Sequence, residues 1–313
     1  MRRIIAILFI FFSLSCSCAY AYWIWTPKTG KWVNPKALPK ATPKEQFDFA
    51  KDFYDAKKYP DAQREFKKLL KAFPKSLEAS ESQYYLGVIE EAQGNLYEAY
   101  KAYQKVIDKY PFSERIQEII DREYKIAEVF MAGHKRKAMG VALPVENPAI
   151  EILGKIIENS TYGPLASKAQ YQLGLVLKGL ERYYEAEEVF NKVISNYPDS
   201  QWFDAAKFQV AVCRQAVSRG PDYDQGASKE AREKFEEFTR EHPEAELSLQ
   251  AQENVYQLNE KEAEANFNIA RFYEKQKAFD AAKVYYRDIA DNHSDSPWAA
   301  KAMERLQIME KKK

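Results

Sequence analysis

Apolar residues recur along the chain at helical spacing, and this pattern itself repeats. The segments YYLGVIEEAQGNLYEAYKAYQKVIDKYPFS (84–113) and YQLGLVLKGLERYYEAEEVFNKVISNYPDS (171–200) share a Leu-Gly pair, an alanine, an aromatic residue, a valine and a closing proline. The alanine, aromatic and valine stand at i, i+4 and i+7, on one helical face. Proline cannot continue the helix. Each segment is therefore predicted to be a two-helix hairpin of tetratricopeptide type, with the glycine where the helices cross closely.

Six such hairpins can be placed between Phe47 and His293. No helix breaker interrupts residues 244–266, so one long helix is predicted to run into the sixth hairpin. Ser296 and Pro297 open a last helix that would cap the array. The predicted fold class is all-α, a superhelical tetratricopeptide solenoid of about six hairpins. The expected inward residues of the second helices are Ala62, Phe66 and Leu69; Ala99, Tyr103 and Val106; Ala149, Leu153 and Ile156; Ala186, Phe190 and Val193; Ala231, Phe235 and Phe238; and Ala282, Tyr286 and Ile289.

The amino terminus has the form of an export signal. Arg2 and Arg3 precede an apolar run over residues 4–14, which is shorter than the roughly 20 residues that span a bilayer. The triplet ending at Ala21 fits cleavage by signal peptidase. The alternative is acylation at Cys16 or Cys18, although neither has a regular lipobox. Both alternatives take the protein out of the cytoplasm.

Residues 22–43 are predicted to form a tail rich in proline, lysine and tryptophan. Turn-forming residues at 26–30 could fold Trp32 back toward Trp25, with Trp23 on the same side as Trp25. A disordered leader is the alternative, but disordered tails are poor in aromatic residues. We expect the tail to dock by these tryptophans on the first repeats or on a partner rather than in lipid, although membrane interfaces also attract tryptophan and lysine.

The predicted organisation is a signal peptide at 1–21, the tail at 22–43, four repeats at 44–200 and a carboxy-terminal repeat region at 201–313. Lysine plus arginine (47) nearly balance aspartate plus glutamate (46), which argues against nucleic-acid binding. Cleavage after Ala21 would leave only Cys213, expected to be a small buried residue.

No pattern for catalysis or for a cofactor is visible. The histidines His134, His242 and His293 are far apart in sequence and lack metal-ligand spacing. A glycine-rich phosphate loop and a nucleophile elbow are also missing from the sequence. We therefore predict a protein that is not an enzyme and holds no cofactor or metal.

One aromatic position recurs on the first helix of every hairpin. Two interpretations fit these rings: they pack between helices, or they form an exposed ladder that accepts a peptide in the concave groove. We name them as candidate groove residues: Phe47, Tyr84, Tyr124, Tyr171, Phe208 and Phe267.

A second candidate is the basic run Lys135, Arg136 and Lys137, in a segment (133–148) that interrupts the third hairpin. It is either a solvated loop or a contact loop, since binding residues are often placed in loops on a rigid scaffold.

The export signal, the repeats ending in YPxS, the insertion DYDQGASKEAREKFEEF and the long helix before FNIARFYEKQKAFDAAKVYYRDIADNHSDS together resemble the family of the outer membrane assembly factor BamD. The resemblance covers residues 45–310. It implies a periplasmic, usually lipid-anchored repeat protein that binds the barrel-inserting subunit and receives unfolded outer membrane proteins. Here the amino-terminal side carries more repeat material than the family usually has, and the chain stops about half a repeat after the long-helix unit.

The resulting functional prediction is a periplasmic adaptor associated with the outer membrane, whose partners are the barrel-assembly machinery and unfolded outer membrane proteins. The tail or a lipid anchor would supply any membrane contact. The alternatives are an adaptor for cell division that acts with the Tol system, an adaptor for polysaccharide export and, far behind, a hydrolase subunit.

Overall fold

The computed structural model describes residues 23–27, 30–34, 38–138, 141–142, 146–218 and 225–310. The signal region and Cys16 and Cys18 lie outside these residues. The fold is an all-α solenoid of tetratricopeptide repeats, as predicted. The chain divides into two compact units, residues 1–116 and 117–313, which are described separately. Within the described residues, no helix combines the length and apolar character needed to cross a membrane.

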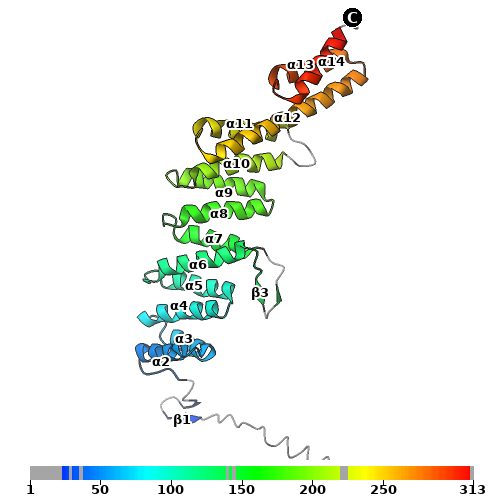
Figure 1. Ribbon diagram of the computed structural model, residues 1–313. Helices are drawn as coiled ribbons and strands as arrows, with labels where there is room; N and C mark the ends of the chain where they lie inside the picture. Colours follow the sequence, from blue (N-terminus) through cyan, green and yellow to red (C-terminus); the bar gives the residue numbers. More distant parts are fainter. Residues whose placement is uncertain are drawn as a thin grey trace, which may run out of the picture. The chain divides into compact units, whose positions relative to one another are not determined.

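The first unit holds a short β-hairpin and two helical hairpins (Figure 1). Thr42 caps the first helix because its hydroxyl accepts a hydrogen bond from the backbone N–H of Glu45 at 3.2 Å, and Pro43 follows at the first helical position. Both helical hairpins turn through a residue with positive φ, Lys57 in one and Gly94 in the other. The elements are β1 (Ile24–Thr26), β2 (Lys31–Val33), α2 (Pro43–Asp55), α3 (Tyr59–Ala72), α4 (Leu77–Ala92) and α5 (Leu96–Lys109).

The second unit holds the remaining hairpins and the last helix (Figure 1). Consecutive helices α7 to α14 pack against one another in sequence order, as a solenoid requires. The elements are α6 (Ile116–Met131), β3 (Lys137–Ala138), β4 (Val141–Ala142), α7 (Pro148–Asn159), α8 (Ala166–Gly179), α9 (Tyr183–Asn196), α10 (Phe203–Val217), α11 (Gln225–Glu241), α12 (Glu246–Lys275), α13 (Phe279–Asn292) and α14 (Pro297–Glu310).

The core consists of the residues predicted to face inward. All eighteen positions named for the second helices are at most 1% exposed. Full burial of a large apolar side chain stabilises the fold by about 1.5–3 kcal/mol. The expected close crossings are also confirmed, because a Cβ added to Gly87 would lie 2.3 Å from the Tyr103 ring and one added to Gly174 would lie 2.5 Å from the Phe190 ring.

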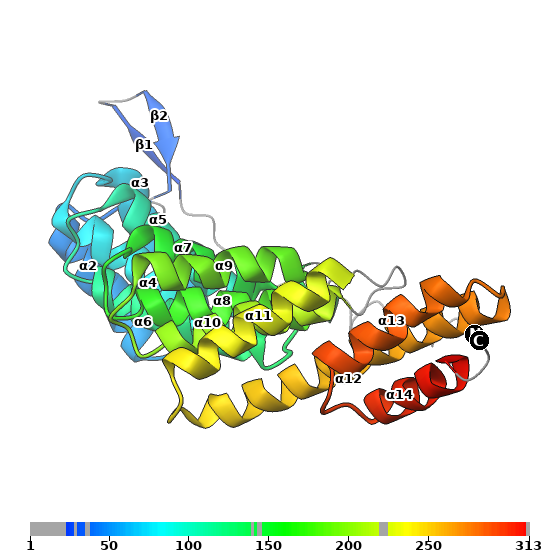
Figure 2. The same ribbon diagram turned by 90° about the horizontal axis from the view of Figure 1, so that it is seen from above.

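Helix α12 is the predicted long helix, and it belongs to two cores. Ala251 and Leu258 on its first half pack with residues of α10 and α11. Ala263, Phe267 and Ala270 on its second half pack with α13 and α14. Figure 2 shows α12 passing from α11 to α13 and α14. One helix therefore joins the fifth hairpin to the sixth.

Candidate functional site

The recurring aromatic residues of the first helices are mostly core residues. Five of the six, Tyr84, Tyr124, Tyr171, Phe208 and Phe267, are at most 8% exposed, and Phe47 is half-buried. Their burial contradicts the interpretation of these residues as an exposed ladder. The other interpretation, packing between helices, describes these rings. A peptide lying in the groove would not meet five exposed rings.

The reason is that five of the six rings meet an aromatic residue of the second helix. Tyr84 lies 5.9 Å from Tyr103, Tyr171 lies 5.5 Å from Phe190, and Phe267 lies 5.4 Å from Tyr286, measured between ring centroids. Phe47 and Phe208 make the same kind of pair with Phe66 and Phe235, at 5.7 and 5.6 Å. Aromatic pairs at these distances add stability beyond the burial of their area.

Tyr124 differs because the second helix of its hairpin carries Leu153 at the equivalent place. The Lys168 ammonium lies 4.5 Å from its ring centroid instead, a cation–π contact. Burial raises the pKa of Tyr124, and the nearby lysine partly opposes this shift. This ring too takes part in packing.

A column of glutamines beside these rings was missed from sequence. Gln46, Gln83 and Gln170 each stand directly before the aromatic residue, and each side-chain amide donates to a backbone carbonyl nineteen residues later. The acceptors are the carbonyls of Glu65 (3.1 Å), Ala102 (3.0 Å) and Val189 (3.3 Å). The signal available in the sequence was a glutamine at one register position in three repeats. In the structure each of these glutamines is at most 7% exposed.

A pocket lies on the surface of the second unit, among the carboxy-terminal repeats. It has a volume of about 470 Å³ and lies between α11, the first half of α12 and the turn from α13 to α14. Val255 and Tyr256 supply its apolar surface, and Tyr256 is 44% exposed. We call it the α12 groove. It lies where α12 leaves one core and enters the next.

The rim of the α12 groove is charged and more acidic than basic. Glu236, Glu260 and Asp295 lie on it with one arginine, Arg240. The charge of Glu260 is the main cause that raises the pKa of Tyr256. Such a rim with an apolar floor suits a segment that brings an apolar side chain and basic or hydrogen-bond-donating groups.

His293 contributes a buried polar atom to the same groove. The residue is 5% exposed, and its Nδ1 has no hydrogen-bond partner among the described residues. Buried polar atoms are rarely left unpaired in native proteins. Sequence reasoning did not connect this histidine with Tyr256, because the two line one groove only through the packing of α12 and α13.

The tail forms the turn predicted from its sequence. β1 and β2 are antiparallel, and Trp25 is paired with Trp32, with ring centroids 5.8 Å apart. Trp23, Trp25 and Trp32 are 55, 47 and 63% exposed. The structure thus brings two of the three candidate tryptophans together and leaves all three open to contact.

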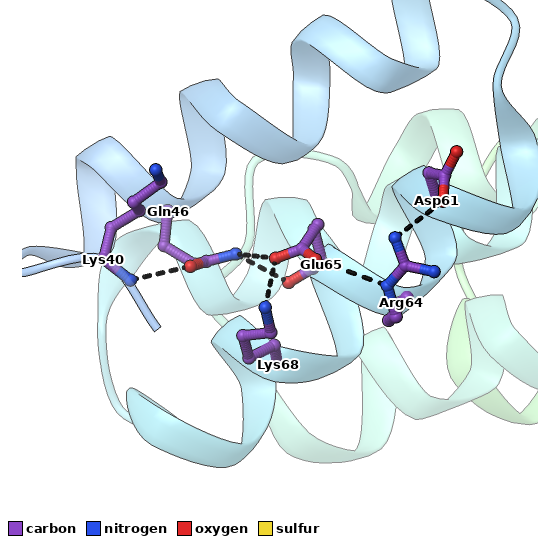
Figure 3. A network of polar contacts seen from close by, with 6 residues as sticks. All are labelled: Lys40, Gln46, Asp61, Arg64, Glu65 and Lys68. Carbon is purple, nitrogen blue, oxygen red and sulfur yellow. Dashed lines mark hydrogen bonds and ion pairs between the residues drawn. The ribbon is translucent and has the colours of Figure 1, made fainter. Parts of the chain in front are cut away.

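A polar network holds the base of this tail (Figure 3). The Lys40 backbone N–H donates to the Gln46 side-chain carbonyl at 2.8 Å, and the Gln46 amide donates to a Glu65 carboxylate oxygen at 3.0 Å. Lys68 lies 2.7 Å from the same carboxylate, and Arg64 contacts both Glu65 and Asp61.

The buried carboxylate of Glu65 is charged because of these partners. Burial is the largest single influence on its pKa and would raise it, but hydrogen bonds from Lys68, Gln46 and Arg64 together outweigh burial and lower the pKa. The network therefore fixes the chain at the entrance to α2 through a charged group.

The basic run of the third hairpin leads into β3, which begins at Lys137 and pairs with β4 in a small antiparallel sheet. Lys135 is exposed and Arg136 is half-buried. For Lys137 the structure describes the backbone, in β3, without its side chain. A contact role for this run stays a prediction.

Groups suited to catalysis do not gather in the described residues. Cys213 is fully buried, as expected, and burial raises the pKa of its thiol to about 11. At neutral pH it is therefore a thiol and not a nucleophilic thiolate. No group of histidine, cysteine and carboxylate side chains in the described part of the chain is arranged to hold a metal ion.

Comparison with known families identifies the repeats. Residues 147–313, more than half of the chain, match the family described as "YfiO: Outer membrane lipoprotein". Residues 47–114 match a tetratricopeptide repeat family. These matches confirm the BamD-like resemblance found in the sequence. The region matched to the lipoprotein family contains the whole α12 groove. No curated protein matches the chain.

Several solved structures are similar in part. The MamA protein is 21% identical, with 64% of this chain and 92% of MamA covered and a TM-score of 0.34. The carboxy-terminal part of a tetratricopeptide-repeat protein from Cytophaga hutchinsonii is 20% identical, with coverage of 84% and 88% and a TM-score of 0.35. YrrB, described as having an unusual peptide-binding site, is 18% identical, with coverage of 66% and 90% and a TM-score of 0.33. These scores are low, so no function is transferred from these structures.

Proposed function

We propose that this chain, which belongs to the YfiO family of outer membrane lipoproteins, is a non-enzymatic scaffold for the assembly of β-barrel proteins in the outer membrane. It would act in the periplasm, bound to the outer membrane, after export by residues 1–21. Its partners would be proteins of the assembly machinery and unfolded outer membrane proteins. The observation that carries the proposal is the family match across residues 147–313, which form most of the repeat array.

The α12 groove is the surface that we assign to a partner protein. It is open, it has an apolar floor at Val255 and Tyr256, and its rim can pair with basic groups. Tetratricopeptide scaffolds bind partners through such surfaces between helices, and an exposed tyrosine is well suited to an interface because one end is apolar and the other polar. The partner segment would place an apolar residue against Tyr256 and a basic residue near Glu260.

The test is copurification from membranes of the native host. The wild-type chain should bring down a barrel-inserting protein, and Tyr256→Ala should bring down much less. Leu249→Ala is the matched control, because Leu249 is also exposed on α12 but does not line the groove. Both substitutions are at exposed positions and should change stability by no more than about 0.5 kcal/mol.

Two results would overturn parts of this proposal. If the wild-type chain copurifies only with Tol or polysaccharide-export components, the role in barrel assembly is wrong. If Tyr256→Ala and Leu249→Ala retain the barrel-inserting protein equally, the scaffold role stands but the α12 groove is not the contact.

A further inference from the structure

The β-hairpin of β1 and β2 carries an aromatic face. Trp25 and Trp32 are paired across the strands, and Trp23 stands two residues before Trp25, so the pleat places all three on the same side. Gly30 closes the turn with φ +61°, a conformation that residues with a Cβ rarely adopt. The tryptophans are therefore held together by backbone geometry.

The side chains of the three tryptophans are largely exposed to solvent. Their exposed fractions lie between 47 and 63%, and Ile24 in the same hairpin and Leu38 after it are 44 and 51% exposed. Clusters of exposed apolar side chains usually mark a surface that contacts another apolar body. Tryptophan in particular favours the membrane–water interface, where its ring is apolar and its N–H can bond to water or headgroups.

The charge of residues 22–44 indicates which kind of surface the hairpin contacts. Residues 22–44 contain five lysines and no acidic residue, in a chain that is otherwise nearly balanced. A segment that combines several lysines with exposed aromatic rings is attracted to anionic phospholipid headgroups. The same segment would gain little from an uncharged protein surface.

The hairpin is also attached closely to the first repeat. The backbone of Lys40 is bonded to Gln46 of α2, and its ammonium lies 4.1 Å from the Phe49 ring centroid. Val33 and Pro43 are ten residues apart in the chain, so the distance between them is at most about 35 Å. A contact made by the hairpin would thus keep the first repeat near the surface that it touches.

We propose that the β1–β2 hairpin binds the interface of an anionic phospholipid bilayer, with Trp23, Trp25 and Trp32 at the level of the headgroups. This proposal replaces the docking on the first repeats or on a partner that we expected from the sequence, because the three rings are 47–63% exposed and the segment carries no acidic residue. This site is separate from the α12 groove and does not depend on the proposed role in barrel assembly. It also differs from covalent lipidation, since the contact is made by side chains of the mature chain.

The test uses residues 22–313, the exported form expected after cleavage, with vesicles of phosphatidylcholine alone or mixed with phosphatidylglycerol. The wild-type chain should sediment with the anionic vesicles. The triple variant Trp23→Ala, Trp25→Ala, Trp32→Ala should bind at least about tenfold more weakly, because it loses the apolar area that would be buried. Subtracting its emission from that of the wild type isolates the three indoles, and this difference spectrum should shift to the blue when anionic vesicles are added.

Two further variants complete the experiment. Replacing Lys28, Lys31 and Lys36 with glutamine should lower the affinity for anionic vesicles by about fivefold per lysine and keep all the rings. Phe112→Ala removes an aromatic ring that is 98% exposed in the repeats and should leave vesicle binding unchanged. The proposal is overturned if the triple variant binds vesicles as the wild type does, or if Phe112→Ala lowers binding as much as the triple variant. It is also overturned if the difference spectrum is already blue-shifted without vesicles and does not change, as docking on the repeats would require.

Discussion

The hairpin of α8 and α9 and the hairpin of α12 and α13 use the same residue pattern with different helix lengths. Helix α8 has 14 residues, and its Tyr171 and Leu177 are buried in the core that also contains Phe190 of α9. Helix α12 has 30 residues and contributes to two cores. The difference shows that the repeat pattern builds the scaffold, while a change in helix length creates a surface that the pattern alone does not contain.

The consequence is visible in the position of the α12 groove. On α12 the sixth hairpin begins only at its second half, so the turn between α13 and α14 faces α11 across Val255 and Tyr256. The uncovered part of α12 becomes the floor of the groove. The length of one helix therefore decides where this groove forms.

The largest expected effect comes from a substitution that destabilises one of the two cores of α12 and tests whether the other core stays folded. Phe267→Ala should destabilise the second core by about 3–5 kcal/mol, because a buried aromatic ring is removed. Hydrogen exchange followed by mass spectrometry should show lost protection over 263–310 and retained protection over 203–241. Leu249→Ala, at an exposed position of the same helix, is the control and should change neither region. An equal loss of protection in both regions would mean that α12 transmits the damage and that the two cores unfold together.

The regular hairpin depends on a close helix crossing, and a pair of glycines can test this. Gly174→Ala should cost about 3 kcal/mol, because its Cβ would meet the Phe190 ring at 2.5 Å. Gly154→Ala, in the interior of α7, should instead stabilise the protein by about 0.5–1 kcal/mol, since no atom lies within 4 Å of the new Cβ. Urea denaturation of the two variants measures both values. Similar effects at the two sites would show that α8 and α9 can move apart, and the crossing would then not define the repeat.

Sequence reasoning predicted the hairpins well because their inward residues are few in kind and fixed in spacing. Small and aromatic residues on one helical face can pack in few ways. The inward position of Phe190 and the close helix crossing at Gly174 could therefore be predicted. The sequence left packing and an open ladder as alternatives for the aromatic column, because exposure depends on which ring of the second helix stands opposite. Tyr171 is buried by Phe190, and that pairing is a matter of tertiary contact.

The α12 groove and the glutamine column could be predicted only in part. The long helix was evident from the absence of breakers, but the presence of His293 and Tyr256 in one groove depends on how α13 packs on α12. Gln83 looks like an ordinary polar residue in one repeat, and only its recurrence before the aromatic residue indicates an inward position. Turn chemistry predicted the pairing of Trp25 and Trp32, because that interaction is local.

A third prediction concerns the glutamine column, which the two kinds of hairpin use differently. In the first hairpin Gln46 joins the buried carboxylate of Glu65, whereas in the α12 hairpin the equivalent Asn266 bonds to the side chain of Asp288 at 2.8 Å. Glu65→Gln should lower stability at pH 7 by about 1–2 kcal/mol, because the hydrogen bonds to a charged group are lost. Asn266→Ala should cost less, since its bond is only partly buried.

The cost of Glu65→Gln should depend on pH. The pKa of Glu65 is lowered from its ordinary value of 4.5, so its contribution is fully present above that value and is lost as the pH falls through the folded-state pKa. Urea midpoints of wild type and variant should therefore differ by a constant amount from pH 7 to about 5 and converge below the ordinary pKa. A gap that stays constant to pH 3 would mean that the carboxylate charge does not stabilise the network.

The smallest expected effect concerns a feature that both kinds of hairpin share, the left-handed residue in the turn. Gly94 takes this place between α4 and α5 with φ +76°, and Lys277 takes it between α12 and α13 with φ +61°. A lysine pays a steric penalty there that glycine avoids, while glycine loses more conformational freedom on folding. Lys277→Gly should therefore stabilise the sixth hairpin by about 0.5–1 kcal/mol, and Gly94→Ala should destabilise the second hairpin by a similar amount. Thermal midpoints of the two variants should move in opposite directions. If Lys277→Gly has no effect while Gly94→Ala does, the turn after α12 is held less tightly than the turn between α4 and α5. The α12 hairpin would then depart from the regular repeat in its turn as well as in its helix length.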